Sequence, residues 1–328
     1  KIFPKNILSP LEQSQNGVTN KNITCKPSLM PIMSKSGYIY CVQPKTAITL
    51  NNVLNWSIDH PEMPKIELRF QDLSGLNFEY INLSNSDFRW SNFDTAKISN
   101  VDFTRANLSY TDLSGRDMTG TILTGAIISY TNFTGVDLSG KDLTGTILKG
   151  VDLSNVDLSG TILTGADLSH TNLTGVDLSG KDLTGTRLAG VDLSGKDLTG
   201  TILTGADLLN VDLTGTILTR ADLSHTNLTG VDLSGKDLTQ TILRRADLSH
   251  TNFAGVDLIG VDLTGARLVG VDLSGKDLTQ TILINANLEN ATLKNAKLLN
   301  ANLDSANLTN ADLRNTLLVD TNLSNAIL

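Results

Sequence analysis

Large apolar residues recur at every fifth position along most of the chain. From Leu68 to Leu328 the 53 positions in this register are all Leu, Phe, Ile or Met, and no insertion breaks the count. A mostly small side chain stands two residues before each of them, so the pentad reads [A/V/T]-[D/N]-L-[S/T]-[G/N]. A helix would spread this period around its surface, because five residues turn through about 500°. The pattern therefore predicts strands rather than helices.

Each pentad predicts one short strand and one turn. Positions two apart share a face of a strand, so the Leu and the small residue point inward while Asp/Asn and Ser/Thr face water. Gly or Asn at the fifth place supplies the backbone conformations that turns need. Five residues thus make one side and one corner of an all-β coil.

The repeat resembles the pentapeptide repeat family. The motif A-[D/N]-L-x-x of that family stands here as "GADLSHTNL" (165–173) and "ANLTNADL" (306–313), and the resemblance covers residues 68–328. It implies a right-handed quadrilateral β-helix with four pentads per coil. The 53 pentads would then make about 13 coils, and a strand spacing of ~4.8 Å would give a rod roughly 60 Å long.

Residues 1–67 differ from the rest and are predicted to form a separate small module beside the β-helix of residues 68–328. The net charge of the chain is −8, and this segment carries seven lysines against four carboxylates, hence +3, which leaves −11 on the coil. Both cysteines lie here, and a Cys25–Cys41 disulfide would stabilise the module by about 3 kcal/mol. Two unrelated buried thiols are the alternative. No CxxC spacing favours zinc.

A second resemblance concerns the cellular location of the protein. The stretch "CKPSLMPIMSKSGYIYCVQPKTAITLNNVLNW" (25–56) resembles a small two-cysteine module of exported archaeal proteins. The matching residues are Cys25, Cys41, Val42, Pro44, Thr46, Ala47, Leu50 and Trp56. Position 1 is Lys rather than Met, which indicates either a processed mature protein or a trimmed chain. The resemblance implies an extracellular or cell-surface location, and no run of roughly 20 apolar residues predicts a membrane span.

Asparagine sequons agree with that location, although the repeat creates one whenever Asn replaces Asp before Ser or Thr. Asn22 and Asn55 lie outside the repeat and are less trivial. Glycans are therefore expected partners. The candidate acceptors are Asn22, Asn55, Asn82, Asn107, Asn132, Asn172, Asn227, Asn290, Asn307 and Asn322.

Catalytic chemistry is not indicated. His170, His225 and His250 recur in the phrase "ADLSH" with no second ligand beside them, so copying of the repeat explains them better than a metal site. The aspartates predict surface ladders rather than a pair in a cleft. No phosphate loop, nucleophile elbow or basic aromatic patch is present. We expect no enzyme activity, no cofactor, no metal and no nucleic-acid partner.

Two features depart from the pentad pattern. Isoleucine takes the outward Asp/Asn position every 40 residues, which would place an apolar stripe on one face with steps of ~9.6 Å. The stripe indicates either a contact surface or a duplicated 40-residue unit, and it consists of Ile122, Ile162, Ile202, Ile242 and Ile282. Basic residues also take the small inward position, where they must snorkel through a corner or pair with a carboxylate. These are Arg116, Lys141, Lys181, Lys196, Lys236 and Lys276.

The last coil leads to the functional hypothesis. It would expose its apolar core and strand edge, and such edges invite pairing with another chain. Head-to-tail stacking into an extracellular, non-catalytic filament is predicted, with residues 1–67 as the joint and the tail "KIFPKNILSPL" (1–11) against a neighbour. The assembly surface would bring Leu313, Leu318, Leu323 and Leu328 against Ile66, Leu68, Leu73 and Phe78. The alternatives are an acidic DNA mimic that inhibits a topoisomerase, as in some members of the family, and a glycosylated adhesin.

Overall fold

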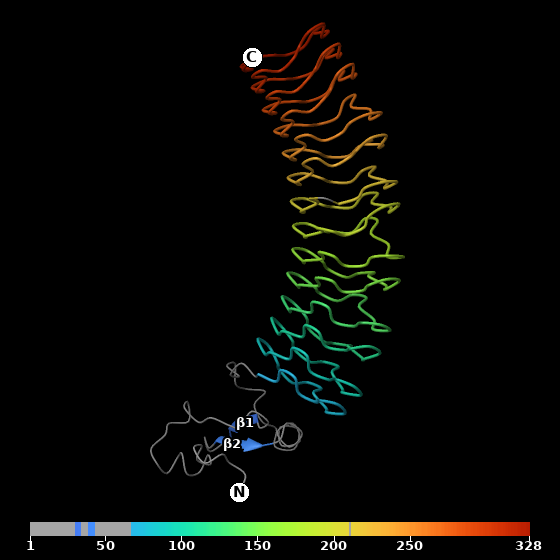
Figure 1. Ribbon diagram of the computed structural model, residues 1–328, viewed down its shortest axis with the longest axis vertical. Coiled ribbons are helices and arrows are strands. Elements are labelled where there is room, and N and C mark those ends of the chain that lie inside the picture. The colour runs from blue at the N-terminus through green and yellow to red at the C-terminus, as the bar shows by residue number, and fades with distance from the viewer. Residues whose placement is uncertain (1–29, 34–38, 43–66, 210) are drawn as a thin grey trace, which may run out of the picture. The chain divides into compact units, whose positions relative to one another are not determined.

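A computed structural model describes residues 30–33, 39–42, 67–209 and 211–328. The strands β1 (Met30–Met33) and β2 (Ile39–Val42) pair antiparallel, with Met30 opposite Val42. The rest of the described chain consists of bridges and turns, and it contains no helix (Figure 1). The chain divides into two compact units. One consists of Lys1–Leu123 with Thr131–Val136, and the other of Thr124–Tyr130 with Asp137–Leu328. The domain boundary predicted at residue 67 stays a prediction. The Cys25–Cys41 bond also stays one, because Cys25 lies outside the described residues.

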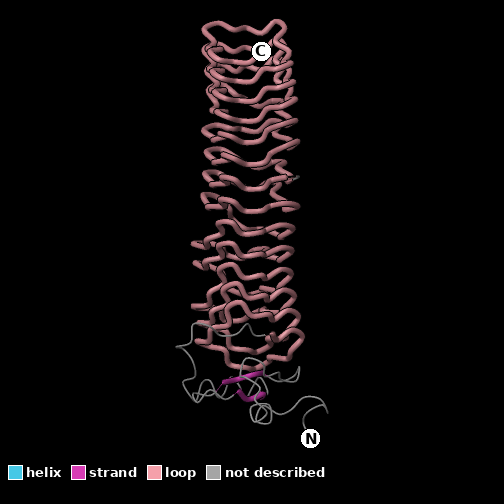
Figure 2. The backbone as a smooth tube through the Cα atoms, turned by 90° about the vertical axis from the view of Figure 1, so that its left-hand side faces the viewer, coloured by secondary structure: helices cyan, strands magenta, loops and turns pink. Residues whose placement is uncertain are grey.

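The bridges repeat every 20 residues, so four pentads make one coil in each unit. In the first unit Asp87 bridges Asn107 in parallel, and in the second Asp167 bridges Arg187, which in turn bridges Asp207. Backbone bonds follow the same step, and Figure 2 shows the coils of each unit lying one upon the next. The number of coils, about 13, is a prediction that follows from this step and the number of pentads.

Every described corner is a tight turn with a left-handed residue. The N–H of Leu76 donates to the carbonyl oxygen of Leu73 at 3.2 Å, which closes a β-turn over Ser74 and Gly75. All described residues at the fifth place have φ between 53° and 74°. A turn with positive φ at its third residue favours Gly and Asn, which explains their use there. Close approach adds a second reason at Gly150, where a Cβ would lie 2.2 Å from a ring carbon of Tyr130.

The Asp/Asn position braces the turn that follows it. The Oδ1 atom accepts the N–H of the residue two places on, at 2.9 Å from Asp142 to Thr144 and 3.0 Å from Asn172 to Thr174. Hydrogen bonds from the side chain and then the backbone of Ser179 hold the pKa of Asp177 below its usual value. The motif [D/N]-L-[S/T] therefore encodes a local hydrogen bond as well as an outward polar residue.

The core is a column of leucines and phenylalanines flanked by small residues. Inward residues such as Leu143 and Leu183 are fully buried, and alanine or valine fills the place two residues earlier. Threonine at that place bonds to the coil below it; Thr201 Oγ1 donates to the carbonyl of Leu178 at 2.9 Å. The inward-outward alternation predicted from the sequence is thus confirmed within the described coils.

The inward lysines are accommodated by carbonyl oxygens of the preceding coil. Lys181 Nζ donates to the carbonyl of Leu158 at 2.9 Å, and Lys196 Nζ donates to those of Leu173 at 2.6 Å and Val176 at 3.0 Å. Lys181 and Leu158 are 23 residues apart, the same separation as between the buried Thr201 and its acceptor Leu178. The partners of these lysines are therefore main-chain carbonyls, whereas the sequence left both snorkelling and pairing with a carboxylate open.

Replacing Lys236 by threonine should stabilise the protein by about 1 kcal/mol at pH 7. Burial lowers the pKa of Lys236, although Asp212 and Asp232 oppose the shift. A lysine whose folded pKa lies below 10.5 disfavours the charged folded state, so wild-type stability should rise as pH increases from the folded pKa toward 10.5. Urea unfolding at pH 7 and pH 10 should show this rise only while the lysine is present.

The control for that substitution is Lys149→Thr, because Lys149 is exposed. It should leave the urea midpoint unchanged at both pH values. A less stable Lys236→Thr protein at pH 7 would mean that the attraction of Asp212 and Asp232 outweighs the burial of the ammonium.

Candidate functional site

Apolar side chains are exposed in the last described coil. Leu303 and Leu308 are buried, whereas Leu318 is 39% exposed and Leu328 is 77% exposed. Leu313 and Leu323 are half-buried, and the outward Ile327 is exposed. The four leucines predicted for assembly thus differ in burial from the equivalent leucines of the coils below.

The first coil is different, because its inward residues are covered in the single chain. Leu68, Leu73 and Phe78 are at most 5% exposed. Ile66, the fourth residue predicted for this side, lies outside the described residues. The outer rim of the coil is accessible, and it contains the ion pairs described next.

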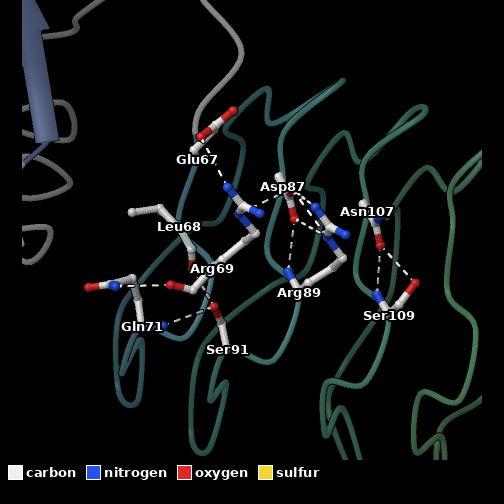
Figure 3. Close-up of polar contacts among 9 residues, drawn as sticks. All are labelled: Glu67, Leu68, Arg69, Gln71, Asp87, Arg89, Ser91, Asn107 and Ser109. Carbon is white, nitrogen blue, oxygen red and sulfur yellow. Dashed lines mark hydrogen bonds and ion pairs between the residues drawn. The ribbon is translucent and has the colours of Figure 1, made fainter. Parts of the chain in front are cut away.

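Four charged residues form a ladder on the outer rim of the first two coils (Figure 3). Arg69 lies 3.6 Å from both Glu67 and Asp87, and Arg89 contacts Asp87 at 2.8 Å. Burial alone would raise the pKa of Asp87, but hydrogen bonds from Arg89 and the charges of Arg89 and Arg69 hold that pKa below its usual value. Ser91 Oγ donates to the carbonyl of Leu68 beside them.

An aromatic stack lies at the corner next to this ladder, and the sequence analysis did not identify it. Phe70 and Trp90 stack with centroids 6.5 Å apart, and Trp90 and Tyr110 stack at 4.1 Å. The three rings are 72%, 52% and 42% exposed. Their spacing of 20 residues at the fifth place was the signal in the sequence.

Four of the five isoleucines of the predicted stripe are exposed. Ile122 is 47% exposed in the first unit, and in the second unit Ile162, Ile202 and Ile242 are 39–49% exposed. Ile282 is half-buried. Aspartates alternate with them, because Ile202 bridges both Asp182 and Asp222. The stripe is thus a mixed acidic and apolar ladder. Ile217 and Ile259 are also exposed, but they lie outside this ladder.

A column of aspartates occupies another face of the second unit. Asp137, Asp157, Asp177 and Asp197 recur every 20 residues, are exposed, and make no β-bridge to one another within the described chain. Like charges directly opposite each other destabilise strand pairing. Hydrogen bonds from Ser159 hold the pKa of Asp157 below its usual value, although the neighbouring Asp137 opposes this. These carboxylates are ionised at neutral pH.

The sequons fall into two groups by the use of the Asn side chain. The Nδ2 atoms of Asn172, Asn307 and Asn322 donate to the coil below at 2.9–3.1 Å, and Asn132 also bonds to Asp112. Within the described ranges Asn82, Asn107 and Asn227 instead accept hydrogen bonds from the residue two places on, from its N–H and, at Asn107 and Asn227, also from its hydroxyl. Asn290 stands at a corner with positive φ. Asn22 and Asn55 lie outside the described residues.

Native protein should therefore exceed its bare mass of 35.1 kDa by discrete glycan increments. Within the coil we expect sugar on Asn82 in preference to Asn172, because the Nδ2 of Asn172 is engaged by Asp152. Mass spectrometry of glycopeptides from the native source tests both statements. Occupied Asn172 with bare Asn82 would contradict the ranking, and an unmodified mass would remove glycans as partners.

Metal and membrane sites do not emerge from the described part of the chain. No group of three His, Cys, Asp or Glu side chains comes together there as a metal site would require. None of the described residues forms a helix able to cross a bilayer. His170 and His250 instead lie against the next corner, where a Cβ on Gly190 or Gly270 would meet their imidazole rings at 2.4–2.6 Å.

The comparisons with known proteins concern the coil. A family model described as "Pentapeptide repeats (8 copies)" matches most of the chain. The matched segments are residues 72–109, 102–140, 142–180, 182–220, 206–245, 221–258, 241–275, 277–310 and 306–328. No match is found among the curated proteins.

Solved structures with the same repeat are similar to this chain at low identity. QnrB1, a plasmid-mediated fluoroquinolone resistance protein, is 17% identical over 63% of this chain and 92% of its own, with a TM-score of 0.41. HetL of the cyanobacterium Nostoc sp. strain PCC 7120, a pentapeptide repeat protein involved in heterocyst differentiation regulation, is 26% identical over 86% of this chain and 95% of its own, with a TM-score of 0.22. The match to the family model, which extends over far more than half of the sequence, shows that the chain belongs to the pentapeptide repeat proteins, whose fold is a right-handed quadrilateral β-helix.

Proposed function

We propose that this protein is a non-catalytic structural subunit that stacks head to tail into a filament. The observation that carries the proposal is the exposure of apolar side chains in the last described coil, where Leu318 and Leu328 are 39% and 77% exposed. Burying such leucines against another chain contributes roughly 1.5–3 kcal/mol for each side chain that becomes fully buried. A second copy of the same chain is the partner, because it offers a coil of the same dimensions.

Backbone hydrogen bonding supports the same partner. In the coil below, the N–H groups of Leu293, Leu298 and Leu303 donate to the terminal coil at 2.7–2.9 Å. The corresponding N–H groups of the terminal coil find no further coil among the described residues. A parallel coil from a neighbour would supply acceptors at the same spacing, and unpaired strand edges favour this kind of pairing.

Head-to-tail contact produces a fibre rather than a closed dimer, because the two surfaces that meet are different. Covering the terminal coil requires the N-terminal region of the neighbour, with residues 1–67 at the joint. The inward residues of the first coil are buried in the single chain, whereas Leu318 and Leu328 of the terminal coil are exposed. The pentapeptide repeat itself supplies a rigid spacer and no chemistry.

The extracellular location is part of the proposal and rests on the N-terminal sequence. The two-cysteine stretch resembles an exported module, and both the Cys25–Cys41 bond and sugar on Asn82 or Asn55 would follow from export. Mass spectrometry of native protein under non-reducing conditions should show the disulfide. Two free thiols in the native material would rule out the bond and weaken the extracellular assignment.

Sedimentation of the purified chain tests assembly. Wild-type protein should pellet above a critical concentration, and the amount left in the supernatant should then stay constant. A protein that remains monomeric at every concentration would overturn the filament.

The aspartate column favours a second candidate, an acidic mimic of DNA that inhibits a topoisomerase. The four exposed carboxylates from Asp137 to Asp197 lie in one row, one in each coil. A duplex carries one phosphate per ~3.4 Å of each strand, whereas strands in a coil stack at ~4.8 Å, so the column is the sparser of the two. Inhibition of a purified topoisomerase that disappears in Asp157→Asn/Asp177→Asn protein would support this candidate over the filament.

A further inference from the structure

The small inward residue of each pentad correlates with the bridge that the same strand makes. Between coils of the second unit, every described strand that follows Ala or Thr at this place is bridged to the preceding coil, as Asp167 is after Ala166. Strands that follow Val or Lys make no such bridge among the described residues, with Asp212 as the one exception. The strands without this bridge are those of Asp157, Asp177, Asp182, Asp192, Asp197, Asp232, Asp237, Asp257, Asp262, Asp272 and Asp277.

Threonine and valine have nearly the same shape, so the hydroxyl group explains their opposite effects. Thr201 Oγ1 donates to the carbonyl of Leu178 in the preceding coil at 2.9 Å, and Thr186 Oγ1 donates to Leu183 of its own turn at 2.8 Å. A methyl group cannot donate in this way, and a C–H···O contact needs roughly 3.3–3.6 Å. Valine therefore keeps its strand away from carbonyl oxygens that threonine binds, and alanine leaves the place empty.

Lysine separates the strands by another route. A bridged strand donates its N–H to the carbonyl 21 residues earlier, as Ile217 does to Lys196 at 3.0 Å. For Asp197 that acceptor is the carbonyl of Val176, and Lys196 Nζ binds it instead, at 3.0 Å. Lys236 Nζ binds the carbonyl 20 residues before it in the same way, at 3.3 Å. The ammonium thus takes the place of the main-chain donor.

Repulsion between aspartates does not account for the pattern. Asp192 and Asp212 carry like charges and are bridged. Asp182 faces the uncharged Ile162 in the preceding coil, yet it makes no bridge to it within the described chain. Asp182 follows Lys181, so the inward residue explains this break and the opposed charges do not.

The two kinds of inward residue are sorted between opposite sides of the coil. On one side, the strands at 147, 167 and each further 20 residues to 327 follow only Ala or Thr, and bridges join them without a break. We call this the ladder side. The strands at 157, 177 and each further 20 residues to 277 lie two pentads away, on the opposite side of the quadrilateral. On this aspartate side only Ile217, which follows Thr216, bridges the preceding coil in the described chain.

We infer that the second unit has one stiff side and one compliant side, and that the inward residue determines which is which. The ladder side keeps neighbouring coils together through continuous main-chain bonds. The aspartate side opens readily, because Val and Lys keep its strands from pairing. The inference concerns the single chain and does not depend on stacking. Deformation of the unit is then concentrated on the side of the aspartate column.

Amide hydrogen exchange of the full chain, resolved to single residues, tests this difference. Relative to their intrinsic rates, the N–H groups of Asp157 and Asp177 should exchange at least about tenfold faster than those of Asp167 and Asp207. The latter two donate to carbonyls of the preceding coil at 2.9 Å. Equal protection on the two sides would overturn the inference.

Exchanging the isosteric residues tests the cause. Val176→Thr should slow exchange at Asp177 about tenfold, because the hydroxyl allows the strand to pair. Thr201→Val should accelerate exchange at Ile202 by a similar factor, because the N–H of Ile202 loses its 2.9 Å bond to the carbonyl of Lys181. Thr184→Val is the matched control, since Thr184 points outward, and it should change neither rate.

The remaining outcomes separate this cause from charge. Unchanged exchange at Asp177 in Val176→Thr protein would overturn the role of the inward residue, and this variant keeps the test decisive even where Thr201→Val protein fails to fold. Asp157→Asn should leave exchange at Asp177 as it is in wild type. Slower exchange there would overturn the assignment in favour of repulsion between the aspartates.

Discussion

Phe88→Ala should destabilise the first unit by about 3–5 kcal/mol. Phe88 is fully buried and packs edge to face against Phe93 and Phe103, with centroids 5.7 and 5.8 Å away. Removing the ring leaves a cavity that the coil cannot close, because the backbone bonds of each coil fix its distance from the next. Urea unfolding followed by tryptophan fluorescence should show the loss, since Trp90 lies two residues away.

Tyr80→Ala is the matched control, because Tyr80 is an aromatic residue of the first coil that is 72% exposed. Its urea midpoint should stay within about 0.5 kcal/mol of wild type. An equal effect of both substitutions would contradict the assignment of Phe88 to the core and of Tyr80 to the surface.

Leu323→Lys should raise the critical concentration for pelleting by at least about a hundredfold. Leu323 is half-buried in the terminal coil, and stacking would bury its replacement, an ammonium, against apolar residues of the neighbour. Burying an unpaired charge costs several kcal/mol, and about 2.7 kcal/mol already corresponds to a hundredfold change in an equilibrium constant.

Deleting residues 1–11 should likewise leave monomers, because the apolar tail is expected to lie on a neighbouring subunit. Sedimentation of each variant measures the effect.

Ser324→Lys is the control for the charge itself, since Ser324 is exposed on the outside of the same coil. It should assemble with a critical concentration close to that of wild type. Leu323→Lys protein that pellets as readily as the control would show that the terminal core is not a contact surface.

The repeat made most of the fold predictable, because each pentad identifies its own inward residues and its own corner. The apolar residue at every fifth place, with a small residue two positions earlier, identifies the inward face. Gly or Asn at the fifth place identifies the corner, as at Gly75 and Asn310, which both have positive φ. The number of residues in a coil came from family resemblance, and the 20-residue bridges confirm it.

Other features depended on contacts between coils, which a single pentad does not encode. The carbonyl partner of Lys196 lies 23 residues away, and only a three-dimensional coil brings the two together. The stack of Trp90 on Tyr110 and the reach of Arg69 to Asp87 both join residues of neighbouring coils. Once the coil length was accepted, the rule that residues about 20 apart are neighbours would have pointed to all three.

The candidate surfaces were located unevenly. Leu318, Leu328 and four of the five stripe isoleucines are exposed, whereas Leu68, Leu73 and Phe78 are covered in the single chain. The acid and arginine pairs went unnoticed because each is ordinary on its own, and only the coil brings Arg69 beside Asp87. Surface chemistry of this kind depends on which side chains face one another.

Electron microscopy of the purified full chain tests head-to-tail stacking most directly. The account predicts unbranched fibres one β-helix wide, with a regular repeat of one subunit. Separate particles of single subunits, or closed dimers joined through their terminal coils, would contradict it.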